Sequence, residues 1–242
     1  MSWLRQIVPE GYAEANLLLT GTSALLMKSG DVDPDGELFR AYVTLGTKRN
    51  KTLDDGANLR KLEWELGLYL DEDLGPYIPS RCVKELLRSA ATKYRRGEDI
   101  RRSLIVVEYR IPLTYEGPRD QDGLWEQGYR KTMKVANAGL NRGRVDRCRP
   151  CFENWSLDVD LAYDPEDLDA DFLELVVERS QKFGLCDGRS IGFGAFTAEL
   201  VHGNRSARPS ANGKATKTRD KLEEIAHAAA KTRVLAGRGS AG

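Results

Sequence analysis

The order of predicted elements favours an α+β fold, because two strand–helix–strand units occur with polar and basic segments between them. The first unit begins at residues 16–28, "NLLLTGTSALLMK", which predict a buried strand with a bulge at Gly-Thr-Ser. Residues 81–96 place apolar side chains at helical spacing, with Ser80 as the expected N-cap and Gly97 as the expected end. Residues 103–115, "SLIVVEYRIPLTY", predict the second strand.

The second unit repeats this order. In residues 155–164, "WSLDVDLAYD", apolar and acidic side chains alternate, which predicts a half-exposed strand. Asp164 and Pro165 are expected to cap and open a helix that stops at Gly184. The core face of that helix is expected to hold Leu168, Phe172, Leu175, Val176 and Phe183. With "FTAELV" at 196–201 as the closing strand, the two units predict a ferredoxin-like, RNA-recognition-motif-type sandwich.

The predicted sandwich carries an insertion and a tail. The insertion, at about residues 36–62, is polar and reads as a mobile, thumb-like excursion. Residues 63–79, "EWELGLYLDEDLGPYIP", predict a hairpin that turns at "DEDLG". From Gly203 the chain is basic and low in apolar residues. We therefore expect a domain over 1–202 and, over 203–242, a flexible linker followed by a tail helix.

The composition is that of an ordinary soluble protein, with 40% hydrophobic and 31% charged residues. No apolar run approaches the roughly 18 residues of a membrane span. Residues 1–9 lack the pattern of a signal peptide. We expect a cytoplasmic protein that does not contact membranes.

The four cysteines do not indicate a secreted disulfide framework at this length. Cys148 and Cys151 have the CxxC spacing of zinc or redox sites, but the remaining thiols, Cys82 and Cys186, are scattered. We expect packed, reduced thiols, with no metal and no cofactor.

The net charge is zero, but the charges are divided into blocks. Residues 130–149 hold seven basic side chains and one acid, residues 151–187 hold eleven acids and two basic side chains, and residues 203–242 hold nine basic side chains and three acids. A basic face of this kind is typical of nucleic-acid binding, and surface charges satisfied by neighbours are the alternative. We read 130–149 as a basic β-ribbon. Tyr129, Trp125 and Phe152 flank it and offer rings for base stacking, although such rings more often belong to a core.

The stretch "GPYIPSRCVKELLRSAATKY", residues 75–94, joins a proline-punctuated turn directly to a basic helix. The first turn of a helix carries unpaired N–H groups and partial positive charge, which favour a phosphate. Pro79 fixes the turn, and Arg81 and Lys84 add full charges beside the amides of residues 80–83. This pattern predicts a phosphate seat, and an ordinary capped helix with surface charges is the alternative.

Part of the same stretch, "PYIPSRCVKELLRSA" at 76–90, resembles the segment before the first helix in the repeat-associated mysterious protein (RAMP) superfamily. The matching residues are Tyr77, Ile78, Pro79, Lys84, Arg88 and Ser89. Ser80, Arg81 and Cys82 stand where the family has Gly-Ser-Ser, and Glu85 replaces a second glycine. "GRSIGFGAF" at 188–196 resembles the superfamily's glycine-rich loop, with Ala195 where a basic residue is usual.

The resemblance covers roughly residues 15–201 in architecture and about 25 residues in motifs. It implies a backbone subunit of a CRISPR effector complex, an antiviral defence system, or a phage- or plasmid-borne relative. Such subunits stack along a guide RNA, so the implied partners are RNA or single-stranded DNA, copies of the chain itself and other subunits of the complex. The predicted nucleic-acid-binding residues are Ser80, Arg81, Lys84, Arg88, Arg130, Lys131, Lys134, Arg142, Arg144, Arg147, Arg149, Arg189, Gly192, Gly194, Lys48 and Arg49.

Catalysis is not expected, because the sequence assembles no convincing set of catalytic residues. Asp31 and Asp33 lie in a turn-forming "GDVDPDGE", and His202 follows the last predicted strand close to the glycine-rich loop. Some RAMP subunits cleave RNA with an aspartate in such a loop, so a RAMP-type endoribonuclease stays open as an alternative. A protein-interaction module that imitates a backbone subunit is the other alternative.

Overall fold

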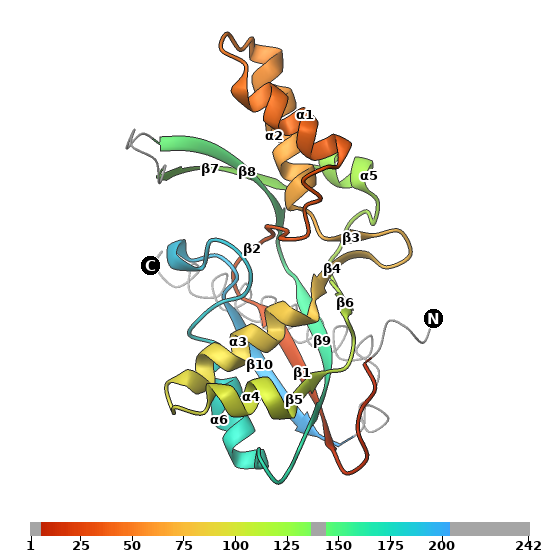
Figure 1. Ribbon diagram of the computed structural model, residues 1–242, viewed down its shortest axis with the longest axis vertical. Helices are drawn as coiled ribbons and strands as arrows, with labels where there is room; N and C mark the ends of the chain where they lie inside the picture. The colour runs from red at the N-terminus through yellow and green to blue at the C-terminus, as the bar shows by residue number, and fades with distance from the viewer. Residues whose placement is uncertain (1–5, 137–143, 204–242) are drawn as a thin grey trace, which may run out of the picture. The chain divides into compact units, whose positions relative to one another are not determined.

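The computed structural model describes residues 6–136 and 144–203. Its main sheet is antiparallel, with the strand order β10-β1-β9-β5 (Figure 1). These strands span Phe196–His202, Ala13–Gly21, Ser156–Tyr163 and Leu104–Val106 respectively. With α3 (Ser80–Thr92) and α6 (Ala170–Ser180), the chain order is β1-α3-β5-β9-α6-β10, which is the ferredoxin-like arrangement. The predicted fold class is confirmed.

The two faces of this sheet differ in polarity. Leu17 and Leu19 of β1 are fully buried opposite Val159 and Leu157 of β9. Helices α3 and α6 pack against one another and against strands of this sheet. On the alternate positions Asn16 donates hydrogen bonds to Asp158 at 2.6 Å and to Asp160 at 2.9 Å. The period-2 pattern of the sequence therefore identified the buried face correctly.

The insertion predicted at about residues 36–62 contains a pair of helices, α1 (Glu37–Thr47) and α2 (Leu53–Gly67), here called the helical hairpin. Thr52 starts α2 with a capping box, in which the Thr52 side chain accepts from the Asp55 amide and the Asp55 carboxylate accepts from the Thr52 amide. Helix α2 buries Trp64 and packs on β8 (Arg144–Phe152). Helix α1 has apolar residues at helical spacing, which the prediction overlooked, although none of its residues is buried.

The predicted hairpin over 63–79 is partly wrong. Residues 63–67 belong to α2, while β3 (Leu70–Asp71) and β4 (Gly75–Pro79) pair around the expected turn. The predicted strand over 103–115 is also divided, because β5 pairs with β9 whereas β6 (Arg110–Pro112) pairs with β4.

Four predicted helix ends are wrong, namely both ends of α3 and both ends of α6, which ends at Ser180 and not at Gly184. Helix α3 starts at Ser80 with Pro79 as its N-cap, and no side chain caps it. It ends at Thr92, before a left-handed Arg95 with φ of 59°, and Gly97 begins the short helix α4 (Gly97–Ser103).

Helix α6 is capped by Asp169, whose carboxylate accepts from the Phe172 amide at 2.7 Å. Asp164 closes only a local turn with the Glu166 amide, so the helix starts later than predicted. This changes the buried face: Leu173 and Val177 are buried, and Leu175 is 40% exposed.

The predicted basic ribbon is present as β7 (Arg130–Ala136) paired antiparallel with β8, and this hairpin is here called the ribbon. Short β2 (Leu25–Leu26) pairs antiparallel with the end of β8, and α5 (Gln121–Glu126) precedes β7. Figure 1 shows the ribbon and the helical hairpin at one end of this unit and α4 and α6 at the other. Arg142 and the predicted tail helix lie outside the described residues. Within the described part of the chain, no helix is both long and apolar enough to cross a membrane.

Candidate nucleic-acid interface

The first turn of α3 follows β4 without a loop. Pro79 adopts φ −62° and ψ 140°, which turns the extended strand into the helix. The Ser80 amide donates to the Tyr109 carbonyl at 3.0 Å and is therefore engaged. The amides of Arg81 and Cys82 are first-turn donors that have no acceptor within the helix. The predicted phosphate seat over residues 80–83 is therefore narrowed to these two amides.

The basic side chains of α3 are partly committed to acids. Arg81 pairs with Asp31 at 2.5 Å, and Arg88 donates twice to Glu85 at 2.6 Å. Burial lowers the pKa of the half-buried Lys84, with a contribution from the charge of Arg101. Both members of the Arg81–Asp31 pair are more than half exposed, at 55% and 52%. Exposed pairs of this kind contribute little, so a phosphate can replace Asp31 at low cost.

The glycine-rich loop contains two glycines with different roles. A Cβ on Gly194 would lie 2.0 Å from the Leu185 carbonyl oxygen. The Gly194 amide donates a hydrogen bond to the Ala24 carbonyl. Gly194 is therefore required for packing. Gly192 has φ of 92° with open space around it, so its backbone is accessible to a ligand.

The glycine-rich loop lies against α3. The pKa of Glu85 is lowered chiefly by hydrogen bonds from Arg88, and the charge of exposed Arg189 lowers it further. Arg189 therefore lies near the second turn of α3. Cys186, just before the loop, lowers the pKa of Cys82 in the first turn. The loop and the start of α3, about a hundred positions apart in the sequence, therefore influence one another's charges.

The register of the ribbon divides its basic residues between two faces. Lys131 is opposite Arg149, and Met133 is opposite Arg147, on one face. The other face carries Arg130, Lys134 and Arg144. The six predicted ribbon residues that the structure describes therefore do not make a single stripe.

Two of these arginines are used to hold the ribbon in place. Arg147 and Arg149 both donate to one oxygen of Glu63 on α2, at 3.1 and 3.0 Å, and the Cys148 amide donates to the other at 2.9 Å. Arg149 also pairs with Asp187, beside the glycine-rich loop, at 3.1 Å. The Glu63 and Arg149 side chains are each only 11% exposed. This cluster, here called the Glu63 network, joins helical hairpin, ribbon and glycine-rich loop.

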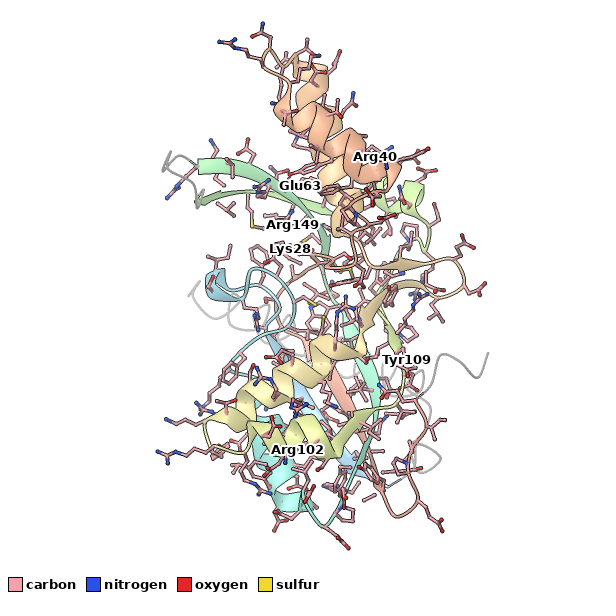
Figure 2. The ribbon with its side chains drawn as sticks, in the orientation of Figure 1. Lys28, Arg40, Glu63, Arg102, Tyr109 and Arg149 are labelled. Carbon is pink, nitrogen blue, oxygen red and sulfur yellow. The ribbon has the colours of Figure 1, made fainter. Side chains whose placement is uncertain are left out.

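A cavity of about 290 Å³ opens beside the Glu63 network. Its lining includes Lys28, Phe39, Tyr42, Arg147 and Arg149. Figure 2 shows Lys28, Glu63 and Arg149 together where the helical hairpin meets the ribbon. The cavity combines cationic groups with aromatic rings, which suits a phosphate next to a base.

A second, more polar groove of about 550 Å³ lies at the base of the ribbon. Phe193 of the glycine-rich loop lines it together with Tyr129, Arg130 and Lys131. Glu116 and Glu153 also line it, so its charge is mixed. The glycine-rich loop and the ribbon therefore share a groove, although they are distant in the sequence.

The three candidate stacking rings differ in exposure. Phe152 is fully buried and cannot stack on a base, so that prediction is wrong. Trp125 packs edge-on against Trp64 and lies 4.4 Å below the Arg130 guanidinium. The half-buried Tyr129 remains the accessible one, since it lines the groove.

The tip of the helical hairpin carries Lys48 and Arg49. Lys48 pairs with Asp55 at 2.5 Å, which lowers the pKa of Asp55 to about 2. Arg49 is exposed and makes no ion pair with another described residue. At this tip, Arg49 is therefore more available than Lys48 to a negatively charged ligand.

The catalytic candidates are occupied by structural contacts. Asp31 pairs with Arg81, and Asp33 accepts from the Asp35 amide in a turn. His202 contacts Tyr163 and Glu174 at the end of β10 away from the glycine-rich loop, so its expected position beside the loop is wrong.

The CxxC pair does not form a chelating site. Cys148 and Cys151 are three residues apart on β8, so their side chains leave opposite faces of the strand. Among the residues that the structure describes, no group of three or more His, Cys, Asp or Glu is placed to hold a metal ion.

Sequence reasoning missed Glu63, Asp187, Tyr42 and Lys28. Glu63 is hidden in an ordinary acidic helix, "RKLEWELG". Because α2 packs on β8, Glu63 lies between Arg147 and Arg149 in the folded chain.

Comparison with known proteins adds limited information. No protein-family model matches the sequence, and no curated protein is similar to it. Among solved structures, one similar chain belongs to "Cryo-EM structure of the Type III-B Cmr-beta bound to cognate target RNA", with a TM-score of 0.49 and 12% identity. The match covers 79% of this chain and 61% of the other, so this chain spans less than two thirds of its neighbour's length.

Proposed function

We propose that this protein binds single-stranded nucleic acid, with RNA as the first candidate, and that copies of it assemble along the strand as RAMP-type backbone subunits do. One observation carries the proposal. The glycine-rich loop and the ribbon, which are far apart in the sequence, line one groove and are joined beside it by the Arg149–Asp187 pair, and charges of the loop segment act on side chains of α3.

The charges of these elements support a polyanionic ligand. Lys131, Lys134, Arg144 and Arg189 are exposed and make no ion pair with another described residue. Arg81 is held only by an exposed, exchangeable pair. Lys and Arg in a shallow groove with aromatic rings are typical of sequence-tolerant single-strand binding.

The binding test uses fluorescence anisotropy with a labelled single-stranded RNA, the same sequence as DNA, and the RNA duplex. The variant Lys131→Gln/Lys134→Gln/Arg144→Gln should weaken single-strand binding by roughly tenfold to a hundredfold and flatten its salt dependence. The matched control Lys93→Gln/Arg102→Gln/Lys182→Gln removes the same charge, with Lys93 and Arg102 at the end of α3 and on α4 and Lys182 just after α6. Figure 2 shows Arg102 far from the Glu63 network. Equal losses in both variants would mean that only net charge matters, and the proposed interface would be wrong.

Assembly along the strand is tested separately. The particle mass, measured by light scattering, should rise stepwise with RNA length and fall after ribonuclease treatment. A constant mass of one protein per RNA at all lengths would contradict the backbone role. Cleavage of labelled RNA that disappears in Asp31→Asn would instead favour the endoribonuclease.

A further inference from the structure

Helix α1 leaves its apolar side chains unburied. Its sequence, "ELFRAYVTLGT", places apolar residues at helical spacing, yet none of its residues is buried, and Leu38 and Val43 are exposed. Its principal neighbour among the described elements is α2. A helix in a folded protein normally gains most of its stability by packing an apolar face against a neighbour. The exposed apolar surface of α1 therefore indicates that a partner molecule covers it.

A groove of about 870 Å³ lies between α1 and α2. Its apolar lining comes from Ala41 and Leu45 on α1 and from Leu62 on α2. Leu45 and Leu62 are only half-buried, so both side chains remain partly in contact with water. An apolar groove of this kind suits a third helix that inserts side chains at every third or fourth position.

The charged lining of this groove is mainly basic. It contains Arg40, Lys48 and Lys61, with Glu65 as the acid. The Arg40–Asp35 and Lys61–Glu65 pairs are both 3.9 Å long, and the two basic side chains are 67% and 42% exposed. Long, exposed pairs hold their partners weakly, so both cations can turn to another acid. The groove therefore favours a helix with an acidic and partly apolar face.

Helix α6 has a face of this kind. Asp171, Glu174, Leu175 and Glu178 occupy positions i, i+3, i+4 and i+7, and all four line a groove beside β10. Leu175 is an exposed apolar side chain among these acids. Glu174 contacts His202 at 3.1 Å, whereas Asp171 and Glu178 make no ion pair with another described residue. This face matches the α1–α2 groove in both polarity and charge.

The groove and the acidic face of α6 lie at opposite ends of the described unit (Figure 1). Figure 2 likewise shows Arg40, on the helical hairpin, far from Arg102 on α4. One copy therefore cannot place its own α6 in its own groove, and the match has to be made between two copies. Because the two surfaces differ, the contact is heterologous. Each copy then keeps a groove or an α6 available for the next, which gives a filament or a ring.

We propose that the α1–α2 groove of one copy binds α6 of the next copy head to tail. Leu175 enters the apolar lining, and the acids of α6 pair with Arg40 and Lys61. The inference rests on the proposed assembly and identifies the surface that carries it. Exposed ion pairs contribute little each, so the contact is weak between two free copies and becomes effective when a bound strand holds copies side by side.

Carbodiimide crosslinking tests the contact without RNA. Unlabelled and isotope-labelled protein are mixed at high concentration, so that a link between copies can join a labelled to an unlabelled peptide. We expect amide links from Lys48 or Lys61 to Glu174 or Glu178 in such mixed pairs. Their absence would overturn the proposal. Links from the α6 acids to lysines beyond residue 203 in their place would mean that a basic segment covers α6, and this would also overturn it.

A charge exchange tests the same contact by sedimentation velocity. Arg40→Glu/Lys61→Glu, the groove variant, and Glu174→Lys/Glu178→Lys, the helix variant, should each weaken self-association by about tenfold or more, because like charges meet. An equimolar mixture of the two variants should recover the association, because each altered surface then meets its complement. Recovery also shows that both variants are folded, and a mixture that does not recover would overturn the proposal.

The matched control is Glu72→Lys/Asp73→Lys, which makes the same change of charge as the helix variant on the exposed β3–β4 turn. It should associate as the parent does, and an equal weakening would overturn the proposal. If the particle mass still rises stepwise with RNA length in both the groove and the helix variants, copies assemble through another surface and this inference alone fails. If the links and the charge exchange behave as expected but the mass does not follow RNA length, the backbone role fails and the contact stands.

Discussion

Removal of the Glu63 carboxylate tests whether the Glu63 network holds the helical hairpin on the ribbon. Glu63→Ala leaves the guanidinium groups of Arg147 and Arg149 without their shared acceptor and the Cys148 amide without a partner. Breaking a buried pair by removing one partner typically costs about 3–5 kcal/mol. Arg147 is 35% exposed, so water recovers part of its solvation, whereas Arg149 at 11% gains little.

We therefore expect the lower end of that range, about 3 kcal/mol of the free energy of unfolding. For a domain of this size this corresponds to a fall in Tm of roughly 6–12 °C. Urea denaturation followed by circular dichroism measures the free energy directly, and an unchanged m-value shows that the two-state comparison holds. Glu63→Gln keeps the shape and one acceptor, and it should cost less.

The matched control is Glu72→Ala, which removes an exposed carboxylate from the β3–β4 turn and should change the free energy by less than about 0.5 kcal/mol. Folded Glu63→Gln should also bind RNA at least as well as the parent, because the positive charge near the cavity increases. A Glu63→Ala variant as stable as Glu72→Ala would refute the structural role of the network. A loss of RNA binding in stable Glu63→Gln would refute the assignment of Glu63 to structure alone.

Two further predictions use glycines and acid pH. Gly194→Ala should lower the free energy of unfolding by about 2–4 kcal/mol, because the added Cβ would lie 2.0 Å from a backbone carbonyl oxygen. Gly192→Ala should lower it by only about 1 kcal/mol, because only its positive φ is unfavourable for alanine. Equal losses in urea denaturation would contradict this division of roles. A hydrogen bond from Lys48 lowers the pKa of Asp55 from 3.8 to about 2. Hydrogen bonding to Arg101, one turn along the helix, lowers the pKa of Glu98 from 4.5 to about 2. Their stabilising contribution is therefore complete above about pH 4.5 and disappears as the pH falls toward 2, so Asp55→Asn should destabilise the protein at pH 6 but not at pH 2; an equal effect at both values would refute this assignment.

The ferredoxin-like sandwich was predictable from the sequence because its elements bury one face each. Leu157, Val159 and Leu161 in β9 alternate with polar residues, and the apolar side chains of α3 recur every three to four positions. Where a segment buries little, the same reasoning failed. Helix α1 has Phe39, Tyr42 and Leu45 at helical spacing, but none of its residues is buried, and the charged residues that follow it led to the expectation of a polar excursion.

Helix boundaries failed for a different reason. Asp164 and Asp169 are both good N-caps, and either can bond an amide two or three residues on. Which one starts α6 depends on where β9 leaves the sheet, and this is a tertiary property. The same holds for Pro79, where β4 runs directly into α3 and leaves no room for a side-chain cap.

The candidate interface was predictable in its parts and not in its connections. The ribbon, the first turn of α3 and the glycine-rich loop were each identified from local sequence. The acids that neutralise their arginines come from α2 and from the segment before the loop, at Glu63 and Asp187. Nothing in a single sequence assigns a particular acid to a particular arginine over such separations.

This difference determines how much positive charge the ribbon offers to a ligand. Arginine suits shared and buried carboxylates because its planar donors fix the geometry, and Arg147 and Arg149 are used in this way. Arg130 is held over Trp125, which leaves Lys131, Lys134 and Arg144 among the described ribbon residues. Six phosphate contacts would give a log–log salt slope of about −4 on a single strand, and three would give about −2. A difference near −2 between the salt slopes of the parent and of the three-residue variant is therefore what the structure requires. A difference near zero would mean that these three side chains do not contact phosphates.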